Sequence, residues 1–561
     1  MKSETLKNAA VSTLVGATLV TGVILLAPGW GEETSSGPVP KPPAARAMAA
    51  AGAGAPAAPA DLKALIGDYE HWLHSHPGDG QSWAVLGAAY VEHGTRFARP
   101  EDFSKAEEAL GRAREIGTEE PDDVRALVGT AALANARHDY ATARHWGERA
   151  RERAPKAWTV YPVLVDAYNG LGDYKAAGQA MDRLQTLHSG PRVRDREAQI
   201  YQDRGWREDA ATLAHDMTLR AGTPTEKADA LVLQGDLAWD RGEPAEAVDH
   251  YDKALAADPG SHRALAGRAR ALVALDRTSD AQRDYEEALA MAPLPEYALR
   301  AGELAVSLGL DGDAATHFHQ VRSLVQAARA HGVDGDLVLA RLETDHGDAE
   351  SAVRRLQDEW RHGHRSVHVA DAMGWALYRA GRAEDALPFA QLATKQGAAR
   401  HALFLYHRGA IERALGNEGR ARRHIEEALR TNPDFSPLRA PAAREALEAL
   451  GEPSPGGPLD VDGDGLPDEE PWEPPARVAE PSASSSEAPS EAPSGAPSVA
   501  PSGAPFVTPS ASASTGPSAG VSSVGASAGP EASVAPSQRV AQPWASPSVS
   551  TSAAQGVAGV G

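Results

Sequence analysis

The stretch that decides the fold runs from Gly242 to Pro293 and reads GEPAEAVDHYDKALAADPGSHRALAGRARALVALDRTSDAQRDYEEALAMAP. It contains one pattern twice, since the small and aromatic residues of its first half return 34 residues later. They are Ala247, Tyr251, Ala254 and Pro259, and then Ala281, Tyr285, Ala288 and Pro293. Steps of four and three residues place each Ala, Tyr and Ala on one face of a helix, which proline cannot continue. The stretch therefore predicts two similar helical units in succession.

The same register extends to both sides of this stretch. A marker residue, usually glycine, precedes each such helix and recurs eight times at intervals of 33 to 38 residues. The markers are Gly172, Gly205, Gly242, Asp276, Gly309, Gly347, Gly381 and Gly416. Five residues after every marker lies an alanine, from Ala177 to Ala421. One match would mean little in an alanine-rich chain, but eight in one register indicate an internal repeat.

A second register shows how each unit is built. Seven residues before each marker the side chain is small: Val165, Ala198, Gly235, Ala269, Gly302, Ala340, Gly374 and Gly409. A first helix with small residues there can approach the second helix closely, and the pair keeps an apolar outer face that the next pair can bury. We therefore expect an all-α array of stacked antiparallel helix pairs. The only break in the apolar face of the second helices is Glu359.

These residues resemble the tetratricopeptide repeats. The family pattern W-x2-L-G-x2-Y is present from Trp83 to Tyr90, and its later Ala, aromatic, Ala and Pro positions are those of the opening stretch. The resemblance covers residues 80–433 as ten units and implies a helix-turn-helix solenoid, or superhelix, within residues 61–451. We expect residues 440–450 to form a helix that caps the array. The chain also resembles extracytoplasmic repeat proteins of high-GC bacteria, whose function is mostly unassigned.

In this family the first helix of each pair lines a concave groove that holds an extended peptide or a partner's helix. Carried onto this register, the resemblance implies eight groove residues: Asp236, Trp239, Arg263, Arg270, Asp371, Trp375, Tyr378 and Tyr406. Trp, Tyr and Arg are the residue types that most often anchor interfaces. For Trp239 and Trp375, packing against the next helix is the open alternative. The Lys and Asn pairs with which one subclass holds a C-terminal carboxylate are missing.

The N-terminus is predicted to target a membrane. Lys2 and Lys7 precede residues 9–27, which carry no charge and are nearly long enough, as a helix, to cross a hydrocarbon layer of about 30 Å. Residues 1–30 are therefore a signal anchor or a cleaved signal peptide. Because positive charge stays in the cytoplasm, either outcome places the rest of the chain outside it, anchored to the membrane or secreted.

The remaining segments differ in composition from the array. Residues 31–60 are rich in Pro, Ala and Gly and are expected to form a flexible linker. Residues 476–561 consist mainly of Pro, Ser, Ala and Gly and bury too little apolar surface to fold, so they predict a disordered tail, which sugars could modify.

An acidic loop lies between the array and the tail, at residues 452–475. Its carboxylates alternate at Asp460, Asp462, Asp464 and Asp468, with Gly465 at the sixth position of the turn. Calcium prefers such oxygen ligands, and the loop resembles thrombospondin type 3 and dockerin-like calcium loops. Position 12 is Pro471 rather than Glu, so any calcium site at 460–468 is expected to be weak. The alternative is an acidic linker.

Composition and motifs exclude several functions. The chain has 561 residues with 55 Lys and Arg against 77 Asp and Glu, so its net charge is −22 and nucleic acid is not an expected partner. It has no cysteine, which excludes disulfides and thiolate chemistry. No phosphate-binding loop or catalytic constellation is found, so we expect no enzyme and no required cofactor. Two hypotheses remain: a membrane-tethered extracytoplasmic scaffold that binds a protein or peptide, and an envelope carbohydrate-binding or cell-wall assembly factor.

Overall fold

A computed structural model describes residue 38 and residues 41–116, 123–203, 206–395 and 401–451. The chain divides into two units, residues 1–471 and 472–561, and all described residues belong to the first. Throughout the described ranges the regular structure is helical, without a strand, which confirms the predicted all-α class there. None of these helices combines the length and apolarity needed to span a bilayer. The predicted membrane segment, residues 9–27, lies outside the described residues, as do the acidic loop and the tail.

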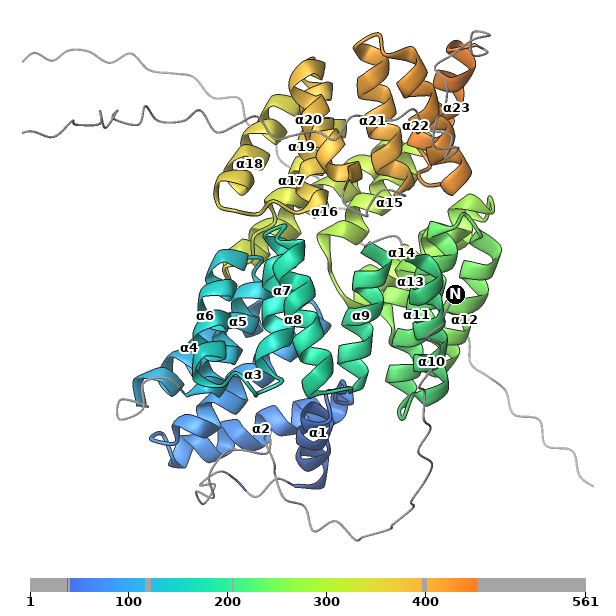
Figure 1. Cartoon of the computed structure of the whole chain (residues 1–561). Coiled ribbons are helices and arrows are strands. Elements are labelled where there is room, and N and C mark those ends of the chain that lie inside the picture. The colour runs from blue at the N-terminus through green and yellow to red at the C-terminus, as the bar shows by residue number, and fades with distance from the viewer. Residues whose placement is uncertain (1–37, 39–40, 117–122, 204–205, 396–400, 452–561) are drawn as a thin grey trace, which may run out of the picture. The chain divides into compact units, whose positions relative to one another are not determined.

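Twenty-three helices make up the described part of the chain (Figure 1). Their bounds are α1 Pro42–Gly52, α2 Pro59–Ser75, α3 Gly80–Arg96, α4 Glu101–Ile116, α5 Val124–Ala136, α6 Tyr140–Arg153, α7 Val160–Gly170, α8 Tyr174–Leu187, α9 Pro191–Asp203, α10 Arg207–Arg220, α11 Pro224–Asp240, α12 Pro244–Ala257, α13 His262–Ala274, α14 Thr278–Met291, α15 Pro295–Ser307, α16 Asp311–Arg329, α17 Asp336–His346, α18 Ala349–Arg361, α19 Val367–Arg379, α20 Ala383–Lys395, α21 Ala402–Ala414, α22 Glu418–Thr431 and α23 Arg439–Ala449.

The helices pack as successive pairs. The ten predicted units are α3 with α4 through α21 with α22, each odd-numbered helix packing on the next even-numbered one (Figure 1). The predicted last helix is also present, since α23 packs on α21 and α22. The helices thus form ten such pairs from α3 to α22, and α23 follows the last pair.

Glycines on the first helices allow the close packing of each pair. A Cβ built on Gly235 would lie 2.6 Å from Tyr251, and one on Gly267 would lie 2.5 Å from the same ring. Tyr251 is completely buried, so its ring fills a hole shared by two consecutive first helices. The same relation holds between Gly302 and Phe318, at 2.4 Å. Small first-helix residues therefore fix both the pairing and the stacking, as the second register predicts.

Six of the seven markers within the described ranges have a positive φ in the turn of their pair, and Gly347, at φ −160°, is the exception. Gly172 has φ +72°, a backbone conformation in which glycine avoids the Cβ penalty of other residues. The next residue, Asp173, then caps α8 by accepting a hydrogen bond from the amide of Ala176 at 3.0 Å. Asp276 adopts φ +58° at the one marker that is not glycine. At these six markers the turn conformation agrees with the register, and Gly205 lies outside the described residues.

The start of the array differs from the sequence expectation. Within the predicted linker, residues 31–60, the structure contains α1, and α2 already begins at Pro59. Alanine is the best helix former, and α1 buries Ala44 and Ala47 in the same core as Leu62 of α2. The Ala-rich segment that suggested a flexible linker therefore contains a helix, because α2 lies beside it. The two helices form an additional pair before the ten units.

Helix ends and loops that are far apart in the sequence also contact one another. We call these contacts the seam: Ser104 with His331, His138 with Asp334, Tyr174 with Val367, and Trp239 with Asn432. Each joins residues separated by 193 to 227 positions. The array therefore makes contacts beyond those between neighbouring pairs.

Candidate partner-binding cavity

A cavity of about 1290 Å³ runs along the first helices of the array. Its lining comes mainly from odd-numbered helices, from Val91 of α3 and Arg196 of α9 to Arg341 of α17 and Phe404 of α21. The second helices contribute few residues. The inner wall therefore consists of the helices that the family resemblance implied.

Three of the eight predicted groove residues line this cavity: Asp236, Trp239 and Arg270. Arg270 donates a hydrogen bond to Asp236 at 3.0 Å and to the Tyr251 hydroxyl at 3.3 Å, and it lies over the Trp239 ring at 4.8 Å. Burial alone would lower the pKa of Arg270, but Tyr251 and Asp236 outweigh it and raise that pKa. The guanidinium is therefore a fixed cation, and it covers Trp239, of which only 6% is exposed.

Arg263 lies about two helical turns before Arg270. It is half exposed, and its guanidinium is 4.0 Å from the carboxylate of Asp229. Arg263 is not among the residues that line the cavity. It belongs to the same helix, α13, as Arg270.

The other four predicted groove residues lie together in a packed cluster rather than on the cavity wall. Trp375 is 5% exposed, stacks on His407 at 4.1 Å and donates its indole hydrogen to Asp345 at 3.0 Å. Asp371 is buried and hydrogen-bonds the same histidine at 3.0 Å. Tyr378 and Tyr406 pack against the Trp375 ring, at 5.0 and 5.9 Å between ring centroids.

Further charged residues of the wall were not singled out from the sequence. Arg300 and Arg341 line the cavity without a hydrogen bond or ion pair to any residue of the described ranges. Burial lowers the pKa of Arg341, Asp371 opposes this effect, and Arg300 adds to it. Arg341 shares the register of Asp236 and Arg270, six residues before a marker, so the repeat itself could have identified it.

Two histidines flank Phe404 on the same wall. His401 stacks on this ring at 4.3 Å, and His368 meets it edge-on at 5.5 Å. Burial and the nearby Arg341 lower the pKa of His368 to about 3. Burial lowers the pKa of His401 to about 4, although Asp371 opposes the shift. Both imidazoles are therefore neutral at pH 7.

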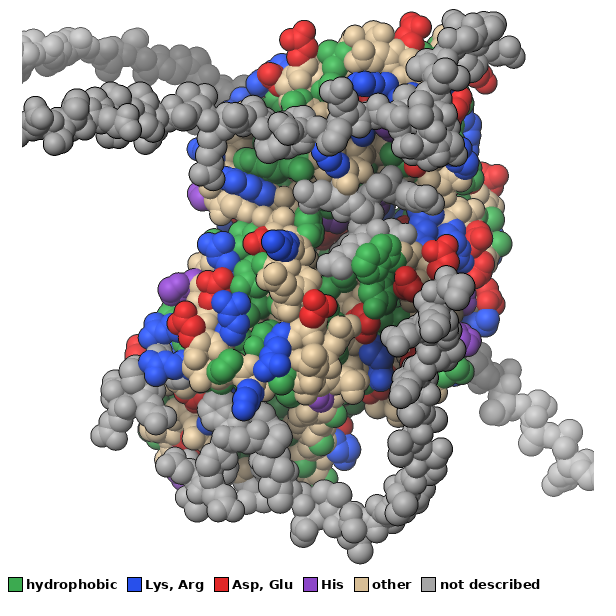
Figure 2. Space-filling model, in the orientation of Figure 1, with side chains coloured by type: hydrophobic (Ala, Val, Ile, Leu, Met, Phe, Trp, Pro, Cys, Tyr) green, Lys and Arg blue, Asp and Glu red, His purple; other side chains and the backbone are tan. Residues whose placement is uncertain are grey.

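The wall as a whole carries both signs of charge in nearly equal number. It includes six arginines, Arg192, Arg196, Arg207, Arg270, Arg300 and Arg341, and seven acids, Glu92, Asp166, Asp236, Asp240, Glu296, Asp334 and Glu359. Several oppose each other directly, as Arg196 does with Asp166 at 2.8 Å. The face of the molecule seen in Figure 2 shows a similar mixture of basic and acidic side chains.

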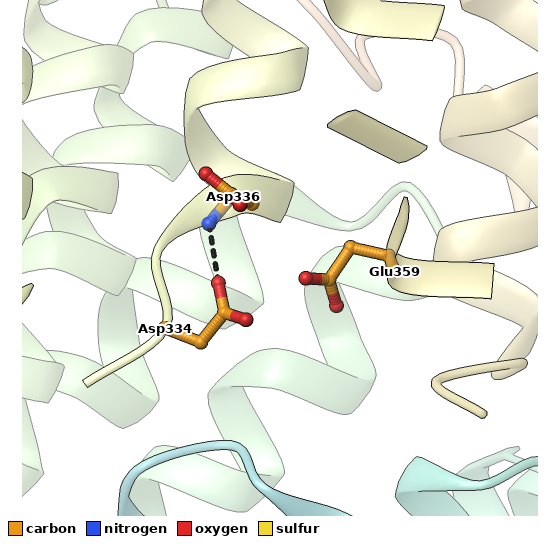
Figure 3. Close-up of side chains that lie close together, drawn as sticks. All are labelled: Asp334, Asp336 and Glu359. Atoms are coloured by element: carbon orange, nitrogen blue, oxygen red, sulfur yellow. Dashed lines mark hydrogen bonds between the residues drawn. The ribbon is translucent and has the colours of Figure 1, made fainter. Parts of the chain in front are cut away.

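Three carboxylates converge beside the cavity: Asp334, Asp336 and Glu359, with oxygens within 4.8 Å of one another (Figure 3). Glu359 is the residue that broke the apolar pattern of the second helices. It accepts a hydrogen bond from His364 at 2.6 Å, and Asp336 accepts one from Arg355 at 3.0 Å. This trio is compensated by its own neighbours.

Neighbouring groups shift the pKa values of two of the three carboxyl groups in opposite directions. Burial and a hydrogen bond to Glu359 raise the pKa of Asp334, whereas His364 and Asp334 outweigh burial and lower the pKa of Glu359. Arg355 and His364 are the neighbours that offset the negative charge of this cluster. The predicted calcium ligands, Asp460, Asp462, Asp464 and Asp468, lie outside the described residues.

Comparisons with known proteins agree with this architecture. Three family models described as tetratricopeptide repeat match residues 196–262, 238–302 and 296–442. The comparison with curated proteins gives no match. The matched residues extend from α9 to α23 and include seven of the eight markers, all but Gly172.

Solved structures of similar fold include the Cut9–Hcn1 hetero-tetramer of APC/C, at 12% identity and a TM-score of 0.34, covering 73% of this chain and 93% of that one. A tetratricopeptide repeat protein from Parabacteroides merdae is 18% identical with a TM-score of 0.28, covering 46% and 98%. Yeast Tom70 is 14% identical with a TM-score of 0.30, covering 69% and 92%. These TM-scores are low and say nothing about function. From its helix pairs, its register and the three family matches, the chain is a tetratricopeptide repeat protein.

Proposed function

We propose that this protein is a scaffold that binds an extended peptide segment of a protein partner in its central cavity. The observation that carries the proposal is the cavity itself, whose 1290 Å³ exceeds the range of about 300–1,000 Å³ typical of small-molecule pockets. First helices from most of the pairs line it, so one ligand can contact many repeats. Tetratricopeptide repeats are a scaffold-type family, and the proposal requires no catalysis.

The charges of the wall indicate the kind of peptide. A ligand of one sign would meet repulsion from about half of the charged groups of the wall, because arginines and acids are nearly equal in number there. A peptide that carries both signs avoids this cost. Arg300 and Arg341 are the cations best placed to bind it, since neither makes a hydrogen bond or an ion pair within the described ranges.

The carbohydrate alternative has less support. Sugar rings stack on aromatic faces that are open, and the two tryptophans suggested for this role are covered. Arg270 lies over Trp239, and His407 stacks on Trp375. A peptide does not need these faces, so it is the ligand we favour.

Crosslinking in intact cells, followed by identification of the attached proteins, tests the proposal. Replacing both Arg300→Ala and Arg341→Ala should reduce capture of a discrete partner at least tenfold, while the fold remains because neither side chain has a partner to lose. The control removes two exposed arginines from the outer helix α22, Arg420→Ala and Arg430→Ala. Equal capture by both double variants would contradict the proposal.

The proposed location is extracytoplasmic, with residues 9–27 as a membrane anchor, or secreted if that segment is cleaved. The uncharged run of 19 residues after Lys2 and Lys7 supports this part of the proposal. Protease added to intact cells should remove an epitope attached at Gly561. Protection of the epitope until the membrane is lysed would contradict an extracytoplasmic location.

A weak calcium site at residues 460–468 is a further part of the proposal. Calorimetry of the full chain with millimolar calcium should show binding that disappears when Asp462→Asn and Asp464→Asn are combined. Heat that persists in this variant would place the calcium elsewhere.

A further inference from the structure

The seam joins turns within early pairs to loops between later pairs. The His138 ring lies 2.7 Å from the backbone oxygen of Asp334, just before α17. The backbone amide of Val367, at the start of α19, donates to the Tyr174 hydroxyl at 2.8 Å. The Asn432 side chain, which follows α22, donates to the backbone oxygen of Trp239 at 2.7 Å. The three contacts repeat at 193 to 196 residues, so they have the same spacing along the array.

Close backbone approach distinguishes the turns of the seam from other turns. A Cβ on Gly172 would lie 2.3 Å from the backbone oxygen of Arg365, and one on Gly242 would lie 2.7 Å from Pro433. Gly309, Gly381 and Gly416 have the same left-handed φ, yet nothing lies within 4 Å of a Cβ there. Glycine therefore serves two purposes in the seam: it forms the turn and admits a second loop.

The seam also forms part of the cavity wall. His138, Tyr174, Trp239, Asp334, Val367 and Asn432 all line the cavity. The cavity is consequently bounded by contacts of two kinds. Neighbouring pairs share extended apolar cores. The seam instead combines a few hydrogen bonds, such as Asp334 to Arg137, with the ring contact of Tyr140 and His364 and the packing of Tyr174 against Val367. Each of these junctions is smaller than a shared core and opens at a lower cost in free energy.

We infer that the seam is a clasp that closes the binding cavity and must open to admit a partner longer than the cavity. This inference rests on the proposed function, because it concerns access to the same site. The helix pairs do not need the clasp to stack, since stacking depends on neighbouring pairs. The clasp therefore controls access without being required for the fold.

A reversible lock tests the clasp in the full chain. The chain has no cysteine, so Ser104→Cys and His331→Cys provide its only two thiols, at positions where Ser104 Oγ and His331 Nδ1 lie 2.8 Å apart. We expect mild oxidation to link residues 104 and 331. The oxidised protein should lose partner capture in the crosslinking experiment at least tenfold, and a reductant should restore it.

Matched glycine variants test whether the seam is closed in the free protein. In the two-cysteine background, Gly172→Ala should slow disulfide formation at least fivefold, because its Cβ meets the opposing loop. Gly381→Ala carries the same backbone strain in open space and should leave the rate unchanged. Equal rates in the two variants, or no disulfide in either, would overturn the clasp.

The outcomes of the lock separate the clasp from the proposed function. Equal capture by oxidised and reduced protein would overturn the clasp alone and leave the cavity as the binding site. No capture in the reduced protein would overturn the proposed function and the clasp with it.

Discussion

Two regions of the array carry similar side chains on their first helices but use them differently. In α11 and α13, Asp236 and Arg270 border the cavity. In α19 and α21, Trp375 and Tyr406 are buried in a packed cluster. The difference arises from neighbours outside each unit, because Asp345 of α17 binds Trp375 and is itself paired with Arg439 of the capping helix. A first-helix residue at a predicted groove position can therefore contact a ligand only where helices of other units do not cover it.

Of the changes considered, removal of the buried Trp375 ring should lower the free energy of unfolding the most. Trp375→Ala should lower the free energy of unfolding in urea by about 3–5 kcal/mol, because it leaves a cavity and removes a hydrogen bond to Asp345. Trp206→Ala, at a ring that is 47% exposed, should cost about 1 kcal/mol or less. Similar losses in the two variants would mean that Trp375 is not part of a core.

The close packing beside the cavity can be broken by one methyl group. Gly235→Ala places a Cβ 2.6 Å from Tyr251 and should destabilise the protein by about 1–3 kcal/mol. Gly111→Ala, in helix α4 with nothing within 4 Å, should stabilise it by about 0.5–1 kcal/mol. Urea unfolding of both variants measures this difference, and the same sign of change in both would contradict the packing argument.

The hydroxyl group of Tyr251 provides a smaller test of the cavity region. Tyr251→Phe should cost about 1 kcal/mol, since the hydroxyl donates to Asp236 at 2.7 Å and accepts from Arg270. Tyr285→Phe is the matched control one unit later, because the Tyr285 hydroxyl has no hydrogen-bond partner in the described ranges. Thermal unfolding should therefore distinguish the two, and equal melting temperatures would show that the Arg270 group adds no stability.

The smallest predicted effect concerns pH at the boundary between the two regions. The pKa values of His368 and His401 lie at about 3 and about 4 in the folded protein, below the ordinary 6.5. As pH falls from 6.5 toward 4, the unfolded chain therefore binds protons that the folded chain does not, and stability is lost.

The variant with both His368→Gln and His401→Gln should lose less stability over this range. Since both rings are partly exposed to solvent, we expect its melting temperature to fall by about 1–3 °C less than that of the original chain between pH 7 and pH 4.5. A parallel fall in the two proteins would mean that these histidines titrate normally.

Much of the architecture could be predicted because it is local and periodic. The Ala, aromatic and Gly registers report contacts within a pair or between adjacent pairs, so ten units and the capping helix followed from them. The seam could not be predicted in this way, since contacts such as Tyr174 with Val367 join residues 193 positions apart and leave no periodic signal. The burial of Trp375 depends on Asp345 and Arg439, which lie in other units, and this explains why the register alone left its role open.

The measurement that tests the central claim most directly is site-specific photo-crosslinking in intact cells. A photoreactive amino acid replaces either His401, on the cavity wall, or Asp249, on the outer helix α12. We predict a discrete crosslinked partner from position 401 and none from position 249. A partner that attaches equally from both positions, or only from position 249, would contradict binding inside the cavity.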